Sequence, residues 1–427
     1  MARLEVSARN IEKAAFEAAP VASPFGGSSM KRKALVLAVA GIVGAPMLAH
    51  AQSGASVTVY GRLYPEIGYS KTSGATPVGT PVSTLVTAPT GENLATLYQE
   101  NTSNSRLGFR GVEPLGGGWS AIFQLEQTIN FDSGTGVLAS RDSFVGLSSD
   151  KFGTVKLGNM DTVYKQVGDN VSFFGLSSGN IVSASNVLSK PGNGVSSTGS
   201  FHLRRANSVV YESPSMQGFG VLAQYSPDEA KGINRNADLI SVGAKYENGP
   251  IYASVAYEKH RDLFGGSNNS KASLSNAADV KANSKDTAVR GTFAYDFGNH
   301  RAEIDVSSLD YKETGGAVGR FQDYRHTTYL IGVESKWTDT VRTAVSYVAA
   351  NAGSCSLVGG AVCTTDGLDG KSINLGAAYY FSKRTYLFAL YAKLWNGKSA
   401  RYNNLQIQTP AAGADTDQLM LGIAHNF

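Results

Sequence analysis

Residues 56–64 read Ser-Val-Thr-Val-Tyr-Gly-Arg-Leu-Tyr, a stretch in which apolar and polar side chains alternate. The two valines and Leu63 fall on one face of an extended chain, while Thr58, Tyr60 and Arg62 fall on the other. This period of two is the pattern of a β-strand with one apolar face. The same pattern recurs in segments of about ten residues, among them 242–246, 251–257, 291–297, 329–333, 373–379 and 419–427. The sequence therefore predicts an all-β fold.

The segments between these strands fall into two classes by length, and the classes alternate along the chain. The short connections are 114–118, 149–153, 214–220, 247–250, 297–300, 337–340 and 381–384. The long connections lie near 71–103, 128–140, 160–203, 227–238, 259–286, 308–324, 349–370 and 396–416. Short periplasmic turns and long extracellular loops are typical of outer-membrane barrels. We therefore predict a closed, antiparallel transmembrane β-barrel of about sixteen strands, with both chain ends on the side of the short turns.

A soluble β-sandwich is the alternative fold, and the polar faces of the strands argue against it. A sandwich needs a packed apolar core between its sheets. Here the second faces carry charged residues, such as Arg290 with Asp296 and Arg301 with Glu303. In a barrel these side chains face water in a lumen while the apolar faces meet lipid, and closure pairs every backbone group. A mean hydropathy of −0.14 is too low for a bundle of membrane helices.

The start of the chain resembles a secretory signal peptide. A basic segment at 31–33 precedes an apolar stretch at 34–49, which ends in an Ala-x-Ala cleavage site before Gln52. These are the three parts of such a signal, and two glycines and a proline in the apolar stretch disfavour a membrane anchor. We expect three parts: an N-terminal extension at 1–29 that comes from a mis-called start codon, a signal peptide at 30–51 beginning at Met30, and the mature barrel at 52–427.

Charge and cysteine content limit the partners. The full chain carries a formal charge of +4, but the leader holds six basic and three acidic residues, which leaves about +1 for the mature chain. This charge gives no support for nucleic-acid binding. Cys355 and Cys363 lie close together with no histidine or carboxylate between them. In an exported chain, this spacing favours a disulfide-closed loop over a metal site. We expect no metal and no cofactor.

Several motifs along the mature chain resemble one family, the trimeric porins of β-proteobacteria, a Neisseria- and Burkholderia-like family of Gram-negative general-diffusion porins. The resemblance rests on Ser-Val-Thr-Val-Tyr-Gly at 56–61, Ser-Arg-Leu-Gly-Phe-Arg-Gly-Val-Glu-Pro-Leu-Gly-Gly-Gly at 105–118, Ala-Ile-Phe-Gln-Leu-Glu at 121–126, Phe-Val-Gly-Leu-Ser at 144–148, Phe-Gly-Thr-Val-Lys-Leu-Gly at 152–158, Asn-Ser-Val-Val-Tyr-Glu-Ser-Pro at 207–214, Tyr-Phe-Ser-Lys-Arg-Thr at 380–385 and the terminal His-Asn-Phe.

This resemblance implies a homotrimer of sixteen-stranded barrels that passes small hydrophilic solutes and ions through a water-filled channel. It also implies that the third long loop, 160–204, folds into the lumen and narrows it, although a loop of this length could instead cover the barrel mouth. Asp161 and Asp169 would supply acidic groups there. Some family members carry Pro-Glu-Phe-Gly in this loop, whereas this chain has Phe-Phe-Gly-Leu at 173–176. Phe427 resembles the C-terminal signal that barrel-assembly machinery reads. Outer-membrane lipid and lipopolysaccharide are the remaining expected partners.

Four basic residues fall on the polar faces of early strands and are candidates for the pore wall: Arg62, Arg106, Arg110 and Lys156. Fixed charges of one sign raise the local concentration of counter-ions in a narrow pore and set its selectivity. We therefore expect a modest preference for anions. The alternative is that carboxylates on the same wall pair with them, and the candidates are Glu66, Glu126 and Asp142.

Two other functions compete with that of a general channel. An enzyme would need a histidine held beside a nucleophile or carboxylate, and no metal-ligand spacing occurs in the sequence. A sugar-specific channel would show a ladder of aromatics along the lumen. The inward tyrosines, Tyr60, Tyr64, Tyr252 and Tyr380, come from strands far apart in the sequence, which argues against a ladder. Adhesion through the long loops remains open as a secondary role.

Overall fold

The computed structural model describes residues 55–102, 104–168, 173–174, 180–194, 199–229, 236–267, 282–406 and 408–427. Residues 52–427 form one compact unit. The expected extension and signal peptide lie outside the described residues, and so does Asp169.

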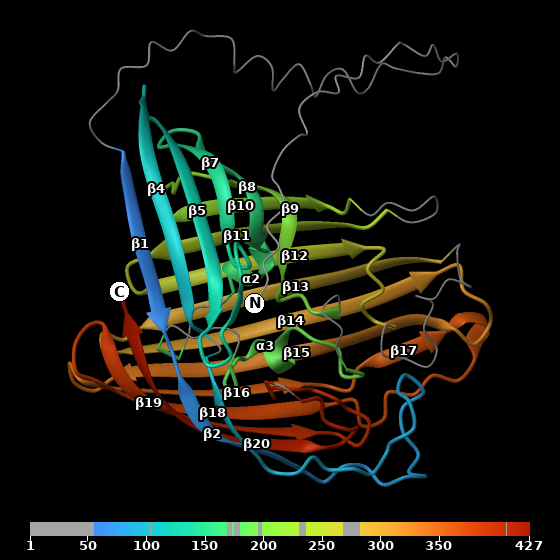
Figure 1. The fold of residues 1–427 in the computed structure, drawn as a ribbon. Helices are drawn as coiled ribbons and strands as arrows, with labels where there is room; N and C mark the ends of the chain where they lie inside the picture. Colours follow the sequence, from blue (N-terminus) through green and yellow to red (C-terminus); the bar gives the residue numbers. More distant parts are fainter. Residues whose placement is uncertain are drawn as a thin grey trace, which may run out of the picture. The chain divides into compact units, whose positions relative to one another are not determined.

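The described residues form one antiparallel sheet of twenty strand segments (Figure 1). The segments are β1 Ser56–Leu63, β2 Glu66–Ser73, β3 Leu97–Asn101, β4 Arg106–Gly116, β5 Trp119–Asn130, β6 Thr135–Val137, β7 Ser143–Ser149, β8 Gly153–Asp161, β9 Arg204–Glu212, β10 Phe219–Pro227, β11 Asp238–Asn248, β12 Ile251–Arg261, β13 Asn283–Asp296, β14 His300–Thr314, β15 Phe321–Lys336, β16 Val341–Ala350, β17 Ser354–Leu357, β18 Gly370–Tyr380, β19 Thr385–Asn396 and β20 Asp415–Asn426.

The twenty segments make sixteen strands of the barrel wall, because in four cases two segments are parts of one interrupted strand. β1 and β2 both pair with β20, and on their other side they pair with β4 and β3. β6 pairs with β5 beyond β7, and β17 pairs with β15 beyond β16. The contact between the first and last strands closes the sheet. The prediction of a closed sixteen-stranded barrel is therefore confirmed.

The observed connections keep the predicted alternation of short turns and long loops. All seven short turns lie where the sequence placed them. One predicted loop, 308–324, is too long, because β14 runs to Thr314 and β15 begins at Phe321. The alternation of apolar and polar side chains continues along these longer strands, but contact with lipid does not explain it. Leu309 and Tyr311 are fully buried against residues inside the barrel, so the strands extend on internal packing.

The two faces of the wall differ as the sequence predicts. Outward apolar side chains such as Val57, Val255 and Ile304 are more than half exposed in the isolated chain, since their solvent is lipid. Inward positions hold polar side chains, and many of these are buried by other parts of the chain. Glu258 and Asp305, for example, have no exposed surface.

The described residues of the third loop, which spans 162–203, lie inside the barrel as predicted. It carries two short helices, α2 Val163–Gln166 and α3 Ser185–Leu188, which lie against the inner wall (Figure 1). α2 contacts β10, β11 and β12, and α3 contacts β15, β16 and β18. Wall side chains hold its backbone: Tyr252 Oη donates to the Val167 carbonyl at 2.6 Å, and Thr328 Oγ1 donates to the Leu188 carbonyl at 2.7 Å.

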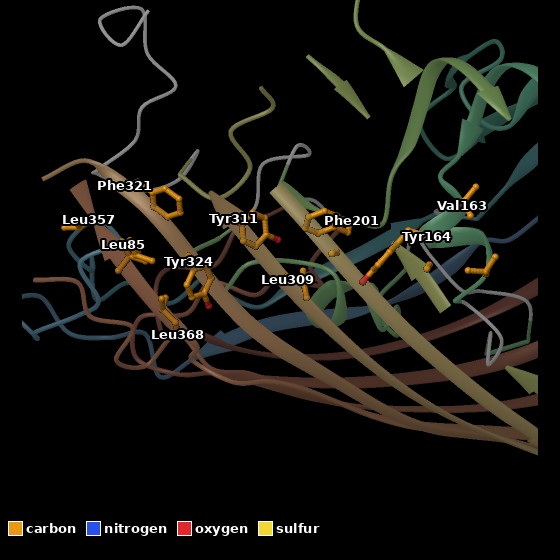
Figure 2. Close-up of a cluster of buried hydrophobic side chains, with 14 residues drawn as sticks. Leu85, Val163, Tyr164, Phe201, Leu309, Tyr311, Phe321, Tyr324, Leu357 and Leu368 are labelled. Atoms are coloured by element: carbon orange, nitrogen blue, oxygen red, sulfur yellow. The ribbon is translucent and has the colours of Figure 1, made fainter. Parts of the chain in front are cut away.

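An apolar cluster joins this loop to the extracellular end of the barrel. Figure 2 shows Tyr164 and Phe201 of the third loop close to Tyr311 and Leu309 of β14. The cluster continues through Phe321 and Tyr324 of β15 to Leu85 of the first loop, residues 74–96, and Leu357 and Leu368 at the seventh, residues 351–369. The seventh loop also contains the 3₁₀ helix Val358–Gly360 and the disulfide between Cys355 and Cys363. The loops are thus packed against one another.

Candidate channel constriction

Three arginines face the lumen from two neighbouring strands. Arg62 of β1 pairs with Arg106 of β4. Arg110 lies four residues further along β4, opposite Thr58 of β1. All three share the face of Tyr60, because the alternating side chains of both strands point outward to lipid. Gly108 stands between the two β4 arginines, where the Tyr60 ring fills the space that a side chain would need. The ring also lies 5.0 Å from the Arg110 guanidinium.

Glu126 on the next strand, β5, is the carboxylate that these basic groups share. Tyr60 Oη donates to Glu126 Oε2 at 2.9 Å, and Arg106 Nε lies 4.0 Å from the same oxygen. Arg141 Nε donates to the other oxygen, Oε1. The Glu126 side chain is only 11% exposed. One negative charge is therefore divided between two guanidinium groups, and the local balance is positive.

A second ion-pair network lies beside the first, at the entrance to the third loop. Arg204 donates through Nε to Asp142 at 2.6 Å and through Nη2 to Asp161 at 2.7 Å. Lys165 reaches the same Asp161 oxygen at 2.9 Å. Asp161 is thus held against the wall from which the loop departs, and it does not stand on the loop opposite the arginines. The two carboxylates here balance two cations.

Lys156 and Arg110 differ in their surroundings. Lys156 Nζ forms an ion pair with Glu212 at 2.7 Å, so its charge is compensated locally. Within the described part of the chain, Arg110 has no carboxylate within 4.0 Å, and its guanidinium lies over the Tyr60 ring. Arg62 Nε donates to the neutral side chain of Asn426 at 2.7 Å. Glu66 is buried beside Tyr64, on the extracellular side of Arg62.

The sequence of the third loop carries little negative charge. Asp169 is its one acidic residue, whereas it contains Lys165 and Lys190. Its Phe173 and Phe174 are buried against β16, β18 and β19, with Tyr386 Oη donating to the Phe174 carbonyl at 3.2 Å. The loop therefore covers the wall formed by the later strands. On the early strands the arginines remain accessible, since Arg106 is partly exposed and Arg110 is exposed.

The expectation that the inward tyrosines are scattered is wrong for two of them. Barrel closure brings β1 next to the last strands, so the Tyr64 ring stacks on Phe388 at 4.3 Å between ring centroids. Tyr386 links this stack to Tyr380 at 4.5 Å. Tyr64, Tyr386 and Phe388 are almost wholly buried under the third loop. The cluster packs the loop against the wall and does not form an exposed aromatic track.

Sequence reasoning missed Arg141 and Arg204, which complete the two networks. Arg141 follows the second long connection. Arg204 is the first residue of β9, the strand that follows the third long connection. Both stand at loop–strand boundaries, where alternation does not yet fix a side chain's direction. A signal was available, because Arg141 is followed by Asp142 and Arg204 by Arg205. Such charged pairs beside a long loop indicate an ionic anchor for it.

Neither a membrane-spanning helix nor a cluster of metal ligands occurs among the residues that the structure describes. None of the helices there is long and apolar enough to cross a membrane. No group of three or more histidine, cysteine, aspartate or glutamate side chains in the same ranges could hold a metal ion.

A closed barrel with a lipid-facing apolar exterior, a polar lumen and one loop folded inside is a channel of the Gram-negative outer membrane. Residues 34–399 match the family model described as Gram-negative porin, so the chain belongs to that family. The family predicted from the sequence is thereby confirmed. As a porin, the chain forms a water-filled channel for the passive diffusion of small hydrophilic solutes and ions.

Individual proteins agree with this membership. Outer membrane porin protein 32 of Delftia acidovorans is 28% identical over 412 residues, covering 93% of this chain and all of that protein. The solved structure of the anion-selective porin from Comamonas acidovorans has a TM-score of 0.65 at 22% identity, with 87% of this chain and 100% of that chain covered. The trimer form of OmpT from Vibrio cholerae has a TM-score of 0.56 at 15% identity, covering 87% and 99%.

Proposed function

We propose that this porin favours small anions over cations, and that the cluster of Arg62, Arg106 and Arg110 determines this preference. The proposal rests on the balance of positive and negative side chains around these three arginines. Glu126 is shared between Arg106 and Arg141, and Arg110 has no carboxylate within ion-pair distance among the described residues. A fixed positive excess in a narrow aqueous pore attracts anions and repels cations.

The position of the third loop supports this assignment. Because the loop covers the wall of the later strands, permeating ions pass along the early strands that carry the arginines. The loop itself brings little negative charge to this passage. A structural neighbour is described as an anion-selective porin, which agrees with the proposal.

The test is the zero-current potential of the purified porin in planar bilayers under a KCl gradient. Wild type should show a modest anion preference that declines as salt rises, because screening shortens the reach of the wall charges. The double variant Arg106→Gln/Arg110→Gln should shift the potential toward cations. Lys383→Gln/Arg384→Gln removes the same charge from an exposed periplasmic turn and should leave it unchanged. A wild-type pore that prefers cations, or an unshifted Arg106→Gln/Arg110→Gln variant, would refute the assignment.

Three further properties belong to the same proposal. We infer a homotrimer in contact with outer-membrane lipid and lipopolysaccharide, as the family and the trimeric form of the Vibrio cholerae neighbour suggest. We also infer export by a signal peptide at 30–51. Finally, we infer recognition of Phe427 by barrel-assembly machinery. Phe427 exchanges two backbone hydrogen bonds with Gly61, each at 3.1 Å, and so lies at the seam between the first and last strands.

A further inference from the structure

A polar cavity of about 500 Å³ lies between the third loop and the eighth loop, residues 397–414. It is separate from the arginine cluster, because it is built from loop residues at the extracellular end of the lumen. Its described lining consists of Asn180, Asn186, Lys190 and Gly194 of the third loop and Arg401, Asn403, Asn404, Leu405, Gln406 and Thr409 of the eighth.

The two loops that form the cavity are fastened to each other and to the barrel. Asn404 Nδ2 donates to the Ile181 carbonyl at 3.0 Å, and the Arg401 N–H donates to the Gly192 carbonyl at 2.9 Å. Thr416 Oγ1 of β20 donates to Asn404 Oδ1 at 2.6 Å. Because these bonds connect the loops to a wall strand, the side chains around the cavity are held in place before any ligand arrives.

The described lining contains two cations and no carboxylate. Lys190 Nζ donates to Asn186 Oδ1 at 3.1 Å, and Arg401 Nη2 donates to Thr87 Oγ1 at 2.8 Å. Both partners are neutral. The neighbouring Lys398 is different, since it forms an ion pair with Asp366 at 2.6 Å. The eighth loop thus compensates one of its cations and leaves Arg401 uncompensated within the described part of the chain.

Arg401 also has an unused hydrogen-bond donor. Its Nε is buried and has no hydrogen-bond partner. Leaving a buried polar group unsatisfied is costly, and the cost is larger for a charged one. A guanidinium edge offers two parallel N–H donors that match the two oxygens of a carboxylate or phosphate. The amide side chains of Asn186, Asn403 and Gln406 can add neutral donors around the same ligand.

From these contacts we propose that Lys190, Arg401 and the surrounding amides form a binding site for a small oxyanion, a phosphate or carboxylate group. The site lies on the extracellular side of the arginine cluster. It goes beyond the proposed anion preference, which depends on long-range charge and needs no bound ion. An oxyanion held here neutralises the positive charge of Lys190 and Arg401 at the extracellular end of the lumen. Its binding therefore weakens the local attraction for chloride and is readable as a reduction of chloride current.

The experiment measures block of chloride conductance by inorganic phosphate in planar bilayers at pH 7. Phosphate should reduce the wild-type current in a saturable way. Lys190→Gln/Arg401→Gln should raise the half-blocking phosphate concentration at least tenfold, because it removes both charge-assisted contacts. The matched control is Lys398→Gln/Lys383→Gln, which removes two charges outside the described lining and should be blocked like wild type. Acetate in place of phosphate tests whether a carboxylate suffices.

The zero-current potential in pure KCl separates this site from the arginine cluster. If the Lys190→Gln/Arg401→Gln variant loses block but retains its anion preference, the oxyanion site is supported independently of the cluster. If phosphate leaves the wild-type current unchanged, or if it blocks this variant as well as wild type, the site is refuted, whatever the ion preference. Folding is checked by the heat-modifiable migration of the variant on denaturing gels, and single Lys190→Gln and Arg401→Gln variants replace a double variant that fails to fold.

Discussion

Glu126→Gln should make the pore more anion-selective. The substitution keeps the size of the side chain and an oxygen that can accept the hydrogen bond from Tyr60. It removes the one negative charge that Arg106 and Arg141 share. The barrel should still close, at a cost of roughly 1–3 kcal/mol for leaving Arg141 without its charged partner. The local balance on this wall then becomes more positive by one charge.

The size of the effect follows from Coulomb's law in the aqueous lumen. For an ion about 8 Å from the carboxylate, one wall charge changes the ion's free energy by about 0.5 kcal/mol in water, and by about 0.2 kcal/mol with 0.1 M salt. The change has opposite signs for anions and cations. The ratio of anion to cation permeability should therefore rise about twofold at 0.1 M salt and about fourfold at 0.01 M.

Zero-current potentials under KCl gradients at several mean concentrations measure this ratio. Glu92→Gln makes the same charge change on the exposed first loop and should alter the ratio much less. A Glu126→Gln pore whose anion preference is unchanged or reduced would show that the network around Glu126 lies outside the conducting path. A change that persists undiminished at 1 M salt would also contradict the electrostatic reasoning, because the Debye length is then only about 3 Å.

Four other predictions concern the loops, the export signal and the assembly. Replacing Cys355 and Cys363 with serine should leave the barrel folded, since the bond closes a separation of eight residues and contributes about 2–3 kcal/mol by chain entropy; failure of the double variant to assemble would contradict this. Burial lowers the pKa of Lys190 to about 8, so block by sulfate, whose charge is constant, should weaken as the pH rises from 6.5 to 9.5. Equal block at both pH values would contradict this prediction. Arg401 is the other charged side chain in the described lining of the cavity. Mass spectrometry of the mature protein should find Gln52 at its N-terminus, and a chain that retains Met30 would argue against export. Unheated samples should migrate as trimers on denaturing gels and as monomers after boiling, and monomers before heating would argue against the homotrimer.

The barrel could be predicted because the patterns that define it lie within short stretches of the sequence. Alternation assigned the faces of strands such as β1 and β12, and the lengths of the connections gave the strand number and the side of the turns. Leu309 and Tyr311 show the limit of this reasoning. Their alternation continues past the expected end of a membrane strand, because the third loop supplies an internal apolar surface there. Nothing in the sequence of β14 distinguishes that surface from lipid.

The candidate constriction was only partly predictable. The inward direction of Arg62, Arg106 and Arg110 follows from alternation and agrees with the structure. The partners do not follow, because an ion pair such as Lys156 with Glu212 joins residues on different strands whose register the sequence does not give. Likewise, barrel closure places Tyr64 beside Phe388, a neighbour more than 300 positions away. Long-range contacts of this kind depend on the complete sheet.

The third loop divides the inside of the barrel into two surfaces that should diverge differently among related porins. The inner side of the later strands is packed like the core of a soluble protein: Arg290, for instance, is buried and bonded to Asp305 and to the Gly168 carbonyl. Substitutions there should mainly reduce heat resistance. The inner side of β1, β4 and β5 borders water, so its charges can change with little loss of folding. Adaptation to new solutes should therefore be concentrated on one half of the wall, while the other half retains its residues to hold the loop.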